Sequence, residues 1–119
     1  QCPFLVDEEN VQRIRQAKEI VIERMAEPPT LPELAAEIGL SLKKLKEGFK
    51  QSYGDSVFSF LFDYKMEMAR KLLVTGKYNV NEVGLKVGYS TASHFIAAFK
   101  KKYDTTPKQY LLSLAQQRA

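Results

Sequence analysis

The sequence predicts an all-α protein of about seven helices, in which a long central helix joins two helix-turn-helix subdomains. Three observations lead to this prediction. Apolar residues recur at helical spacing along nearly the whole chain. Strict apolar–polar alternation, the pattern of a strand, is confined to short runs such as residues 78–81. Finally, one pattern of helix, turn and helix occurs twice, with the copies about fifty residues apart.

Length and charge limit the possible functions. A chain of 119 residues with 45% hydrophobic residues can bury one modest core or two small ones. Its net charge of +4 favours a polyanionic partner. Positive charge collects in residues 43–50 and 100–102, whereas residues 1–40 contain more acidic than basic residues. Those two basic segments coincide with the second helix of each motif, the helix that would enter a DNA groove.

The N-terminal sequence is typical of the end of a linker that is followed by one helix. Residues 1–10 are expected to be a linker remnant, and because the chain opens on QCPF without an initiator Met, we expect it to be the C-terminal piece of a longer protein. Asn10 is placed to cap a helix over residues 11–27. Pro28 and Pro29 end that helix, since neither supplies an N–H and each biases the preceding residue away from helix.

The first helix-turn-helix motif follows. Thr30, with Glu33 three residues later, forms a capping box for a helix that ends at Gly39. Ser41 can then cap a recognition helix over residues 42–53. A recognition helix is the one that such a motif presents to the major groove.

Residues 56–75 predict the longest helix. Its apolar residues lie on more than one side, as expected of a helix that packs against a lobe at each end. They include Phe58, Leu61, Phe62, Met68, Ala69, Leu72 and Leu73. Nearly twenty residues span roughly 28 Å at ~1.5 Å per residue. Two recognition helices must lie about 34 Å apart to enter successive major grooves, so we expect this helix to set that separation.

The second motif repeats the first with one extra residue in its turn. Asn79 can cap its first helix, Gly88 supplies the positive φ of a sharp turn, and Thr91 can cap its recognition helix. Pro107 begins a last helix. The expected organisation is therefore one bipartite domain over residues 11–119. Its parts are lobe one at about 11–55, a linker helix at 56–75 and lobe two at 76–119.

Particular residues in both motifs match a known family, and the second motif carries the more specific signature. They are Leu34, Ala35, Gly39, Ser41, Phe49, Lys50, Gly54, Lys65, Ala69, Leu72 and Leu73, then Val83, Gly88, Tyr89, Ser93, Phe95, Phe99, Lys100, Lys101, Thr106, Pro107 and Tyr110. On these residues the chain resembles the DNA-binding domain of the AraC/XylS family of bacterial transcription regulators. The departures are Gly84 for the usual Ala, Lys65 for Arg, Asp104 for Gly and Leu111 for Arg.

The resemblance implies which side chains of the first recognition helix face DNA. Lys43, Lys46 and Glu47 occupy groove-facing positions. Lys46 can donate to guanine O6 and N7, and Glu47 can accept from cytosine N4. Lys43 reaches either bases or phosphate.

In the second recognition helix the groove-facing candidates are Ala92, Ser93, His94 and Ala97. We expect His94 to be exposed, because it lies off the apolar stripe of that helix. It can bond a base or a phosphate, and either alanine can touch a thymine methyl. This lobe is expected to hold the duplex in position more than it reads the base sequence.

A further set of polar residues is expected to contact phosphate. It consists of the capping residues Ser41 and Thr91, and of Lys50, Lys100 and Lys101. Lys102 is expected to be plain solvated surface, and Tyr89 and Tyr110 to be core aromatics.

The interpretation is sequence-specific binding of duplex DNA by two helix-turn-helix motifs in successive major grooves, which regulates bacterial transcription. The resemblance implies an effector-binding or dimerisation domain beyond this fragment and RNA polymerase as a partner, which favours an activator over a repressor. The alternative from another class is a helical protein–protein interaction module without DNA binding, whose lysines are only solvated. An accessory of DNA repair or recombination is a further alternative.

An enzyme is the poorest interpretation, because no acid–base pair or metal-ligand set converges in the sequence. With Cys2 as the only cysteine, no intramolecular disulfide or cysteine-based zinc site can form, and we expect neither a metal nor a cofactor. No apolar run approaches the ~20 residues that span a membrane, and no signal peptide is visible. We therefore expect a cytoplasmic bacterial protein that is nucleoid-associated when bound to DNA.

Overall fold

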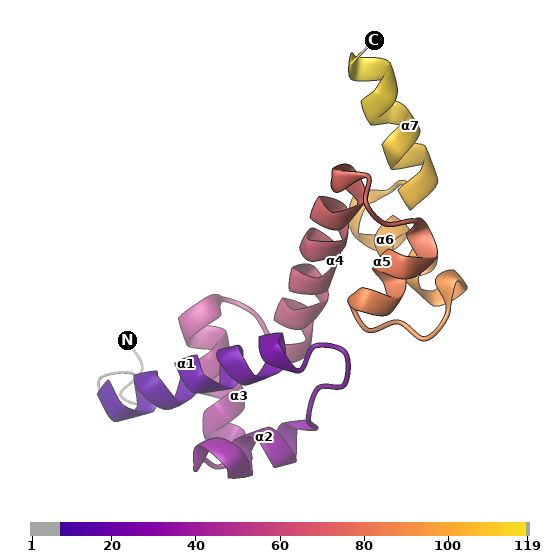
Figure 1. Cartoon of the computed structure of the whole chain (residues 1–119). Coiled ribbons are helices and arrows are strands. Elements are labelled where there is room, and N and C mark those ends of the chain that lie inside the picture. The colour runs from indigo at the N-terminus through magenta and orange to yellow at the C-terminus, as the bar shows by residue number, and fades with distance from the viewer. Residues whose placement is uncertain (1–7, 119) are drawn as a thin grey trace. The chain divides into compact units, whose positions relative to one another are not determined.

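The computed structural model describes residues 8–118, and over that range it contains seven helices and no strand, which confirms the predicted all-α fold (Figure 1). The helices are α1 (Glu8–Glu23), α2 (Leu31–Ile38), α3 (Leu42–Tyr53), α4 (Val57–Thr75), α5 (Val80–Lys86), α6 (Ala92–Tyr103) and α7 (Pro107–Arg118).

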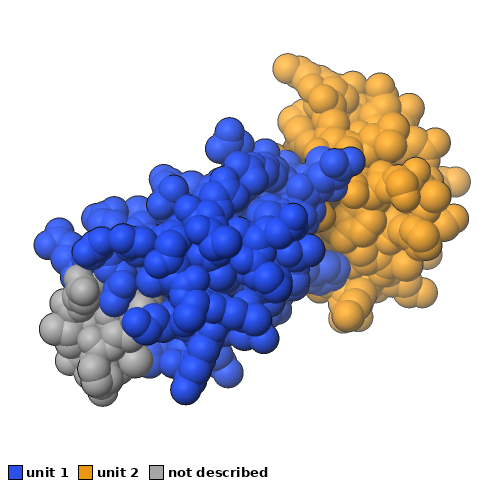
Figure 2. Space-filling model, turned by 90° about the horizontal axis from the view of Figure 1, so that it is seen from below, with its two compact units in different colours: residues 1–62 blue, residues 63–119 orange. Residues whose placement is uncertain are grey.

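The chain divides into two compact units, residues 1–62 and residues 63–119 (Figure 2). The division falls inside α4, so each unit contains one helix-turn-helix motif and part of that helix. The lobe limits suggested by the sequence, 11–55 and 76–119, stay a prediction.

The core of the first unit lies between α1, α2 and α3. Helix α1 packs against both α2 and α3, and α2 packs against α3. The buried residues of this core are Ile14, Ala17, Ile20, Val21, Leu34, Ala35, Ile38, Leu45, Phe49, Val57 and Leu61. Since α1 packs against both helices of the motif, it holds the recognition helix α3 in a fixed position against α2.

In the second unit, α5 packs against α6 and α6 against α7. The buried residues are Met66, Ala69, Leu73, Val83, Val87, Phe95, Phe99 and Pro107. An aromatic chain runs through this unit: the ring centroids of Phe95 and Phe99 are 6.0 Å apart, and Phe99 lies 4.8 Å from Tyr103 and 5.9 Å from Tyr110. Tyr110 and Tyr89 are half-buried and so lie at the edge of the core rather than inside it.

The predicted limits of the first helix were wrong at both ends. Helix α1 begins at Glu8, so Asn10 lies inside it and is not its cap. Two acidic residues in the first turn, Glu8 and Glu9, suit the positive end of the helix dipole and let the helix start earlier. The helix ends at Glu23, and a turn leads from there toward Pro28. Residues 1–7 of the expected linker remnant lie outside the described residues.

The expected apolar face of α4 was wrong at Phe58. Its side chain is 47% exposed, whereas Met66, which the expected face omitted, is fully buried. The buried positions run Val57 and Leu61 in the first unit, then Met66, Ala69 and Leu73 in the second. The step from Leu61 to Met66 breaks the three-or-four spacing of a single stripe, because each half of the helix serves the core of its own unit.

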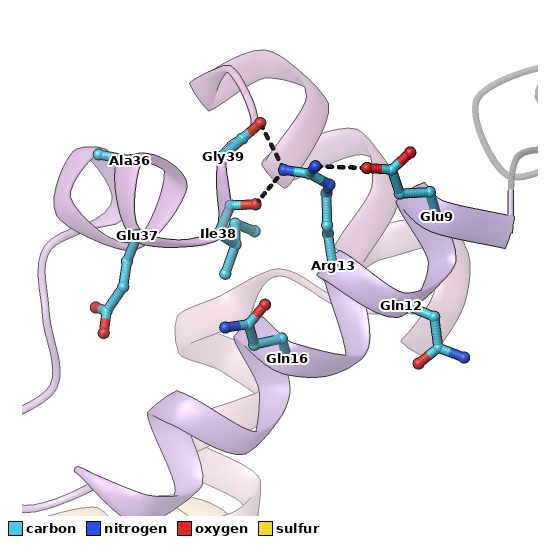
Figure 3. A pocket seen from close by; sticks show the side chains of 8 residues that line it. All are labelled: Glu9, Gln12, Arg13, Gln16, Ala36, Glu37, Ile38 and Gly39. Carbon is cyan, nitrogen blue, oxygen red and sulfur yellow. Dashed lines mark hydrogen bonds and ion pairs between the residues drawn. The ribbon is translucent and has the colours of Figure 1, made fainter.

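Arg13 of α1 closes the C-terminal end of α2 (Figure 3). Its guanidinium donates to the carbonyl oxygens of Ile38 (2.8 Å) and Gly39 (3.2 Å), and it pairs with Glu9 at 2.6 Å. The last carbonyls of a helix lack hydrogen-bond donors within the helix, and the guanidinium of Arg13 supplies donors to two carbonyls here. It crosses a polar pocket of about 440 Å³ between the two helices. The bond fixes the turn from which the first recognition helix starts.

Candidate nucleic-acid interface

Each unit contains a helix-turn-helix motif, as the repeated sequence pattern predicted, and the first helix of each motif ends in the same way. In the first motif Gly39 has φ 76° and the N–H of Leu40 donates to the carbonyl of Ala35. In the second, Gly88 has φ 102° and the N–H of Tyr89 donates to the carbonyl of Gly84. This bond, from one residue past the left-handed glycine back to the last turn, closes the helix and redirects the chain.

The start of each recognition helix is capped as the sequence predicted. The hydroxyl of Ser41 accepts from the N–H of Lys44, and that of Thr91 accepts from the N–H of His94, both at 3.2 Å. Both caps are exposed. Each cap satisfies one N–H and leaves others of the first turn open to solvent, where a phosphate oxygen can accept from them. The phosphate role of Ser41 and Thr91 stays a prediction.

The exposed face of α3 carries the predicted base-contacting residues. Lys43, Lys46 and Glu47 are exposed, while Leu45 and Phe49 on the opposite side are fully buried. Lys50, the predicted phosphate contact of this helix, is exposed as well. Within residues 8–118 these three lysines form no ion pair with the protein, so their charges are available to a polyanion.

The exposed face of α6 carries shorter side chains than that of α3, and its first two turns are nearly free of charge. Ser93, His94 and Ala97 are exposed and Ala92 is half-buried, which confirms that His94 is not a core residue. Lys100 and Lys101, in the last turn, are exposed too.

Lys102 was wrongly taken as solvated surface. Its Nζ lies 2.9 Å from Oδ1 of Asp63 and forms an ion pair between α6 and α4. A second set of polar contacts in this unit joins the same helices. Glu67 accepts from both Arg70 and the hydroxyl of Tyr103 (3.1 Å), and the hydrogen bond from Arg70 lowers the pKa of its carboxyl. Burial raises the pKa of Tyr103 to about 12. These contacts hold α6 in position.

Lys65, at a position where the resemblance expects Arg, contacts the turn of the second motif. Its Nζ lies 5.5 Å from the ring centroid of Tyr89. Burial lowers the pKa of Lys65 and raises that of Tyr89. A cation over an aromatic face contributes about 0.5–1 kcal/mol at a partly exposed site, so Lys65 helps to fix the turn that precedes α6.

The two motifs are equivalent beyond their turns. Both recognition helices have twelve residues and end at a left-handed residue, Gly54 or Asp104. Asp104, with φ 60°, thus takes the place of a glycine, a conformation that Asp tolerates better than most residues. Counting from their first residues, Leu42 and Ala92, the helices align residue by residue at an offset of fifty.

A small recess beside each recognition helix confirms this alignment. The recess of the first unit, about 190 Å³, is lined by Leu31, Lys46, Lys50, Ser56, Val57 and Phe58. That of the second unit, about 380 Å³, is lined by Val80, Asn81, Ile96, Thr106, Pro107 and Lys108. In both, the walls are the first turn of the preceding helix, the middle of the recognition helix and the first turn of the following helix. Ile96 therefore occupies the place of Lys46, and Lys108 that of Phe58.

Sequence reasoning missed four residues at this face. Lys44 is exposed in the first turn of α3, beside the cap. Phe58, Ile96 and Lys108 line the two recesses. The offset of fifty residues would have placed Ile96 opposite Lys46, and so would have pointed to it. Phe58 gave no such signal, because its spacing matches the buried stripe.

Two kinds of site are not found in the described part of the chain. Over residues 8–118, no three His, Cys, Asp or Glu side chains gather where they could hold a metal ion. None of the described helices has the length and apolar character that crossing a membrane requires.

Comparison with known proteins agrees with the geometry. A family model described as a helix-turn-helix domain matches residues 34–113. The xylose operon regulatory protein of Escherichia coli K12 is 37% identical over 73 residues, which are 61% of this chain and 19% of that protein. The chain thus spans about a fifth of the length of this curated relative.

Two solved structures extend the likeness to the fold. A probable AraC family transcriptional regulator from Rhodopseudomonas palustris has a TM-score of 0.68 and 25% identity, and the match covers 86% of this chain and 96% of that one. The DNA-binding domain of the global transcriptional factor AdpA, in complex with a target DNA, has a TM-score of 0.78 over 89% of this chain and 96% of that one. At 21% identity it shows the fold alone. The chain belongs to the AraC/XylS family of helix-turn-helix, DNA-binding transcription regulators.

Proposed function

We propose that this chain binds one stretch of duplex DNA with both recognition helices, in successive major grooves, as the DNA-binding part of a bacterial transcription activator. The observation that carries the proposal is the duplicated motif. Two equivalent recognition helices, each capped and held on its partner helix, present exposed faces that end in lysines. By its family, the whole protein would add an effector-binding or dimerisation domain, recruit RNA polymerase and act in the cytoplasm, at the nucleoid when bound.

The roles of the side chains in α3 follow from their chemistry. Lys46 donates to guanine O6 or N7, Glu47 accepts from cytosine N4, and Lys43 contacts a base or the neighbouring phosphate. Lys50, one turn further along the helix, contacts phosphate, as the hydroxyl and free N–H groups at Ser41 do. Long polar side chains can separate bases by about 1–3 kcal/mol each, so the half-site under α3 is expected to be sharply defined.

Helix α6 offers shorter side chains. Ser93, His94 and Ala97 meet the bases, while Thr91, Lys100 and Lys101 meet phosphate. Ala and Ser cannot make the bidentate bonds that Lys and Glu can, so more of the selectivity here comes from DNA shape. The half-site under α6 is therefore expected to be the softer of two half-sites about one helical turn apart.

The first experiment is selection of duplex DNA by the purified chain, followed by titration at several salt concentrations. If the chain neutralises about six phosphates, log K should fall against log[salt] with a slope of about −5. No binding at about 50 mM salt, where phosphate contacts are strong, would refute the proposal. It would favour a protein–protein module instead.

A matched pair of variants separates base readers from phosphate contacts. Lys46→Ala should lose about 1–3 kcal/mol on the selected site and relax one base position, with little change on random DNA. Lys50→Ala should weaken all sequences alike and reduce the salt slope by about 1. Lys71→Ala, an exposed lysine of α4 outside both recognition helices, controls for net charge. Equal, uniform losses in both α3 variants would show that Lys46 does not read bases.

A further inference from the structure

We propose that Ile96 is the main base reader of the second recognition helix, and that it recognises the 5-methyl group of thymine. The proposal rests on the DNA binding proposed above and adds the chemical group that the second half-site must present. Ser93 and His94, which were proposed above to meet the bases as well, then have the lesser role on α6.

The position of Ile96 follows from the internal repeat of the structure. Ile96 is the fifth residue of α6, as Lys46 is of α3. Each lines its recess together with residues from the first turn of the preceding helix and the first turn of the following one. If the two motifs meet DNA in the same way, Ile96 faces the groove where Lys46 does. Its side chain is half-buried, so part of it is open to a partner.

Two small apolar residues adjoin Ile96 on α6. Ala92, half-buried, precedes it by one turn, and the exposed Ala97 is next in the chain. In the major groove each base pair presents hydrogen-bonding groups, and the thymine methyl is the one apolar feature among them. Isoleucine has neither donor nor acceptor, so the only base feature that it can favour is this methyl. Opposite any other base edge it would cover a polar group without replacing the lost water contact.

The charges around the recess fit the same assignment. The first recess is lined by the cations Lys46 and Lys50 and by the exposed, apolar Phe58. In the second recess Ile96 stands at the place of Lys46, and the exposed Lys108 stands at the place of Phe58. The second unit thus keeps one cation near the groove edge, at the start of α7, for the phosphate, and gives the base-facing position to an apolar side chain.

The expected size of the effect follows from one buried methyl group. Its roughly 0.8 kcal/mol corresponds to about a fourfold change in affinity, at about 1.4 kcal/mol per tenfold. Uracil differs from thymine only in lacking this methyl, so it keeps every hydrogen bond of the base pair. Replacing thymine with uracil therefore isolates the contact.

The test uses the selected duplex in three forms: unmodified, with deoxyuridine for each thymine of the half-site under α6, and with deoxyuridine for each thymine of the half-site under α3. We expect the second form to bind about fourfold more weakly per contacted thymine and the third to bind nearly as well as the unmodified duplex. Ile96→Ala should bind the first two forms alike. Circular dichroism checks that this variant is folded, and the comparison on the unaltered chain stands without it.

Each outcome decides between the two proposals. Steep salt-dependent binding with equal affinity for thymine and uracil forms overturns the role of Ile96 and leaves the DNA-binding proposal intact. A selected half-site under α6 that contains no thymine overturns it as well. Failure of the unaltered chain to bind any duplex overturns both. A loss confined to the α6 half-site, absent in Ile96→Ala, supports the role of Ile96.

Discussion

The contact between Gly84 and Phe95 predicts how tightly the second motif is packed. A Cβ added to Gly84 would lie 3.0 Å from the Cβ of Phe95 and 3.1 Å from its Cγ and Cδ2. Phe95 is fully buried, and its Cβ is fixed to the α6 backbone, so the strain cannot be relieved by rotating a side-chain end. The helices α5 and α6 would have to separate by a few tenths of an ångström.

The magnitude is the balance of two opposing effects. Alanine in place of a helical glycine stabilises by about 1 kcal/mol through helix propensity. Overpacking of a tight core costs about 1–3 kcal/mol, and because the nearest atom is so close to the backbone we expect a value near 2. Gly84→Ala should therefore lower the free energy of unfolding of the second unit by about 1 kcal/mol.

The first motif supplies the compensating change. At the matching positions it has Ala35 and Leu45, both buried, instead of Gly84 and Phe95. Phe95→Leu keeps Cβ and Cγ but replaces the flat ring that carries the close Cδ2, so it should relieve part of the strain that Ala at position 84 meets. The double-mutant cycle should then show a coupling of about 0.5–1 kcal/mol between the two sites, at the lower end of the range for residues in contact.

Urea unfolding by circular dichroism measures the cycle, and hydrogen exchange of the α5 amides reports the second unit separately. If Gly84→Ala stabilises the chain, or if the two changes are additive, the close approach of α5 to α6 is not what requires the glycine. Arg15→Ala, an exposed site on α1 in the other unit, should leave α5 exchange unchanged.

Two further predictions concern side chains that position the motifs. Arg13→Ala removes the two hydrogen bonds to the end of α2 and should cost about 1–1.5 kcal/mol, measured by urea unfolding. Glu67→Gln should cost about 1 kcal/mol or less at neutral pH, since the pair with Arg70 is partly exposed and is screened by solvent. Because the pKa of Glu67 is below its ordinary value, its contribution is present above that value and lost as the pH falls. The difference between wild type and Glu67→Gln should therefore vanish in acid.

Local chemistry in the sequence was sufficient to place most helices. The capping box at Thr30 and Glu33, and the one at Asn79 and Glu82, each consist of two reciprocal hydrogen bonds between residues three apart. Such a signal depends on nothing outside its own segment, so the starts of α2 and α5 were predicted correctly. For α1 the sequence suggested a cap at Asn10, but the helix begins at Glu8, so there the prediction was wrong.

The buried face of α4 depends on tertiary structure and was harder to predict. Phe58 and Leu61 fit one helical stripe, and from spacing alone both belong to the core. Only Leu61 is buried, because the first core touches α4 at Val57 and Leu61 and the second at Met66 and beyond. A single period cannot describe a helix that is shared between two cores. The sequence indicated that α4 is apolar on more than one side, but not where one face gives way to the other.

In the candidate interface, too, some residues could be predicted from the sequence and others could not. Lys43 and Lys46 were predicted because they are charged and lie off the apolar stripe of their helix, and because the family resemblance implies that they face the groove; both are exposed. Ile96 carries no such mark, and its spacing next to Phe95 suggests another core residue. The offset of fifty residues between the two recognition helices and the matching recesses together show that it stands where Lys46 stands. The two motifs share the recognition-helix caps, the left-handed glycine and one buried ring, Phe49 or Phe99, which fix each recognition helix. The residue at the place of Lys46 and Ile96 differs, so the two halves of the bound DNA can be read by different chemistry.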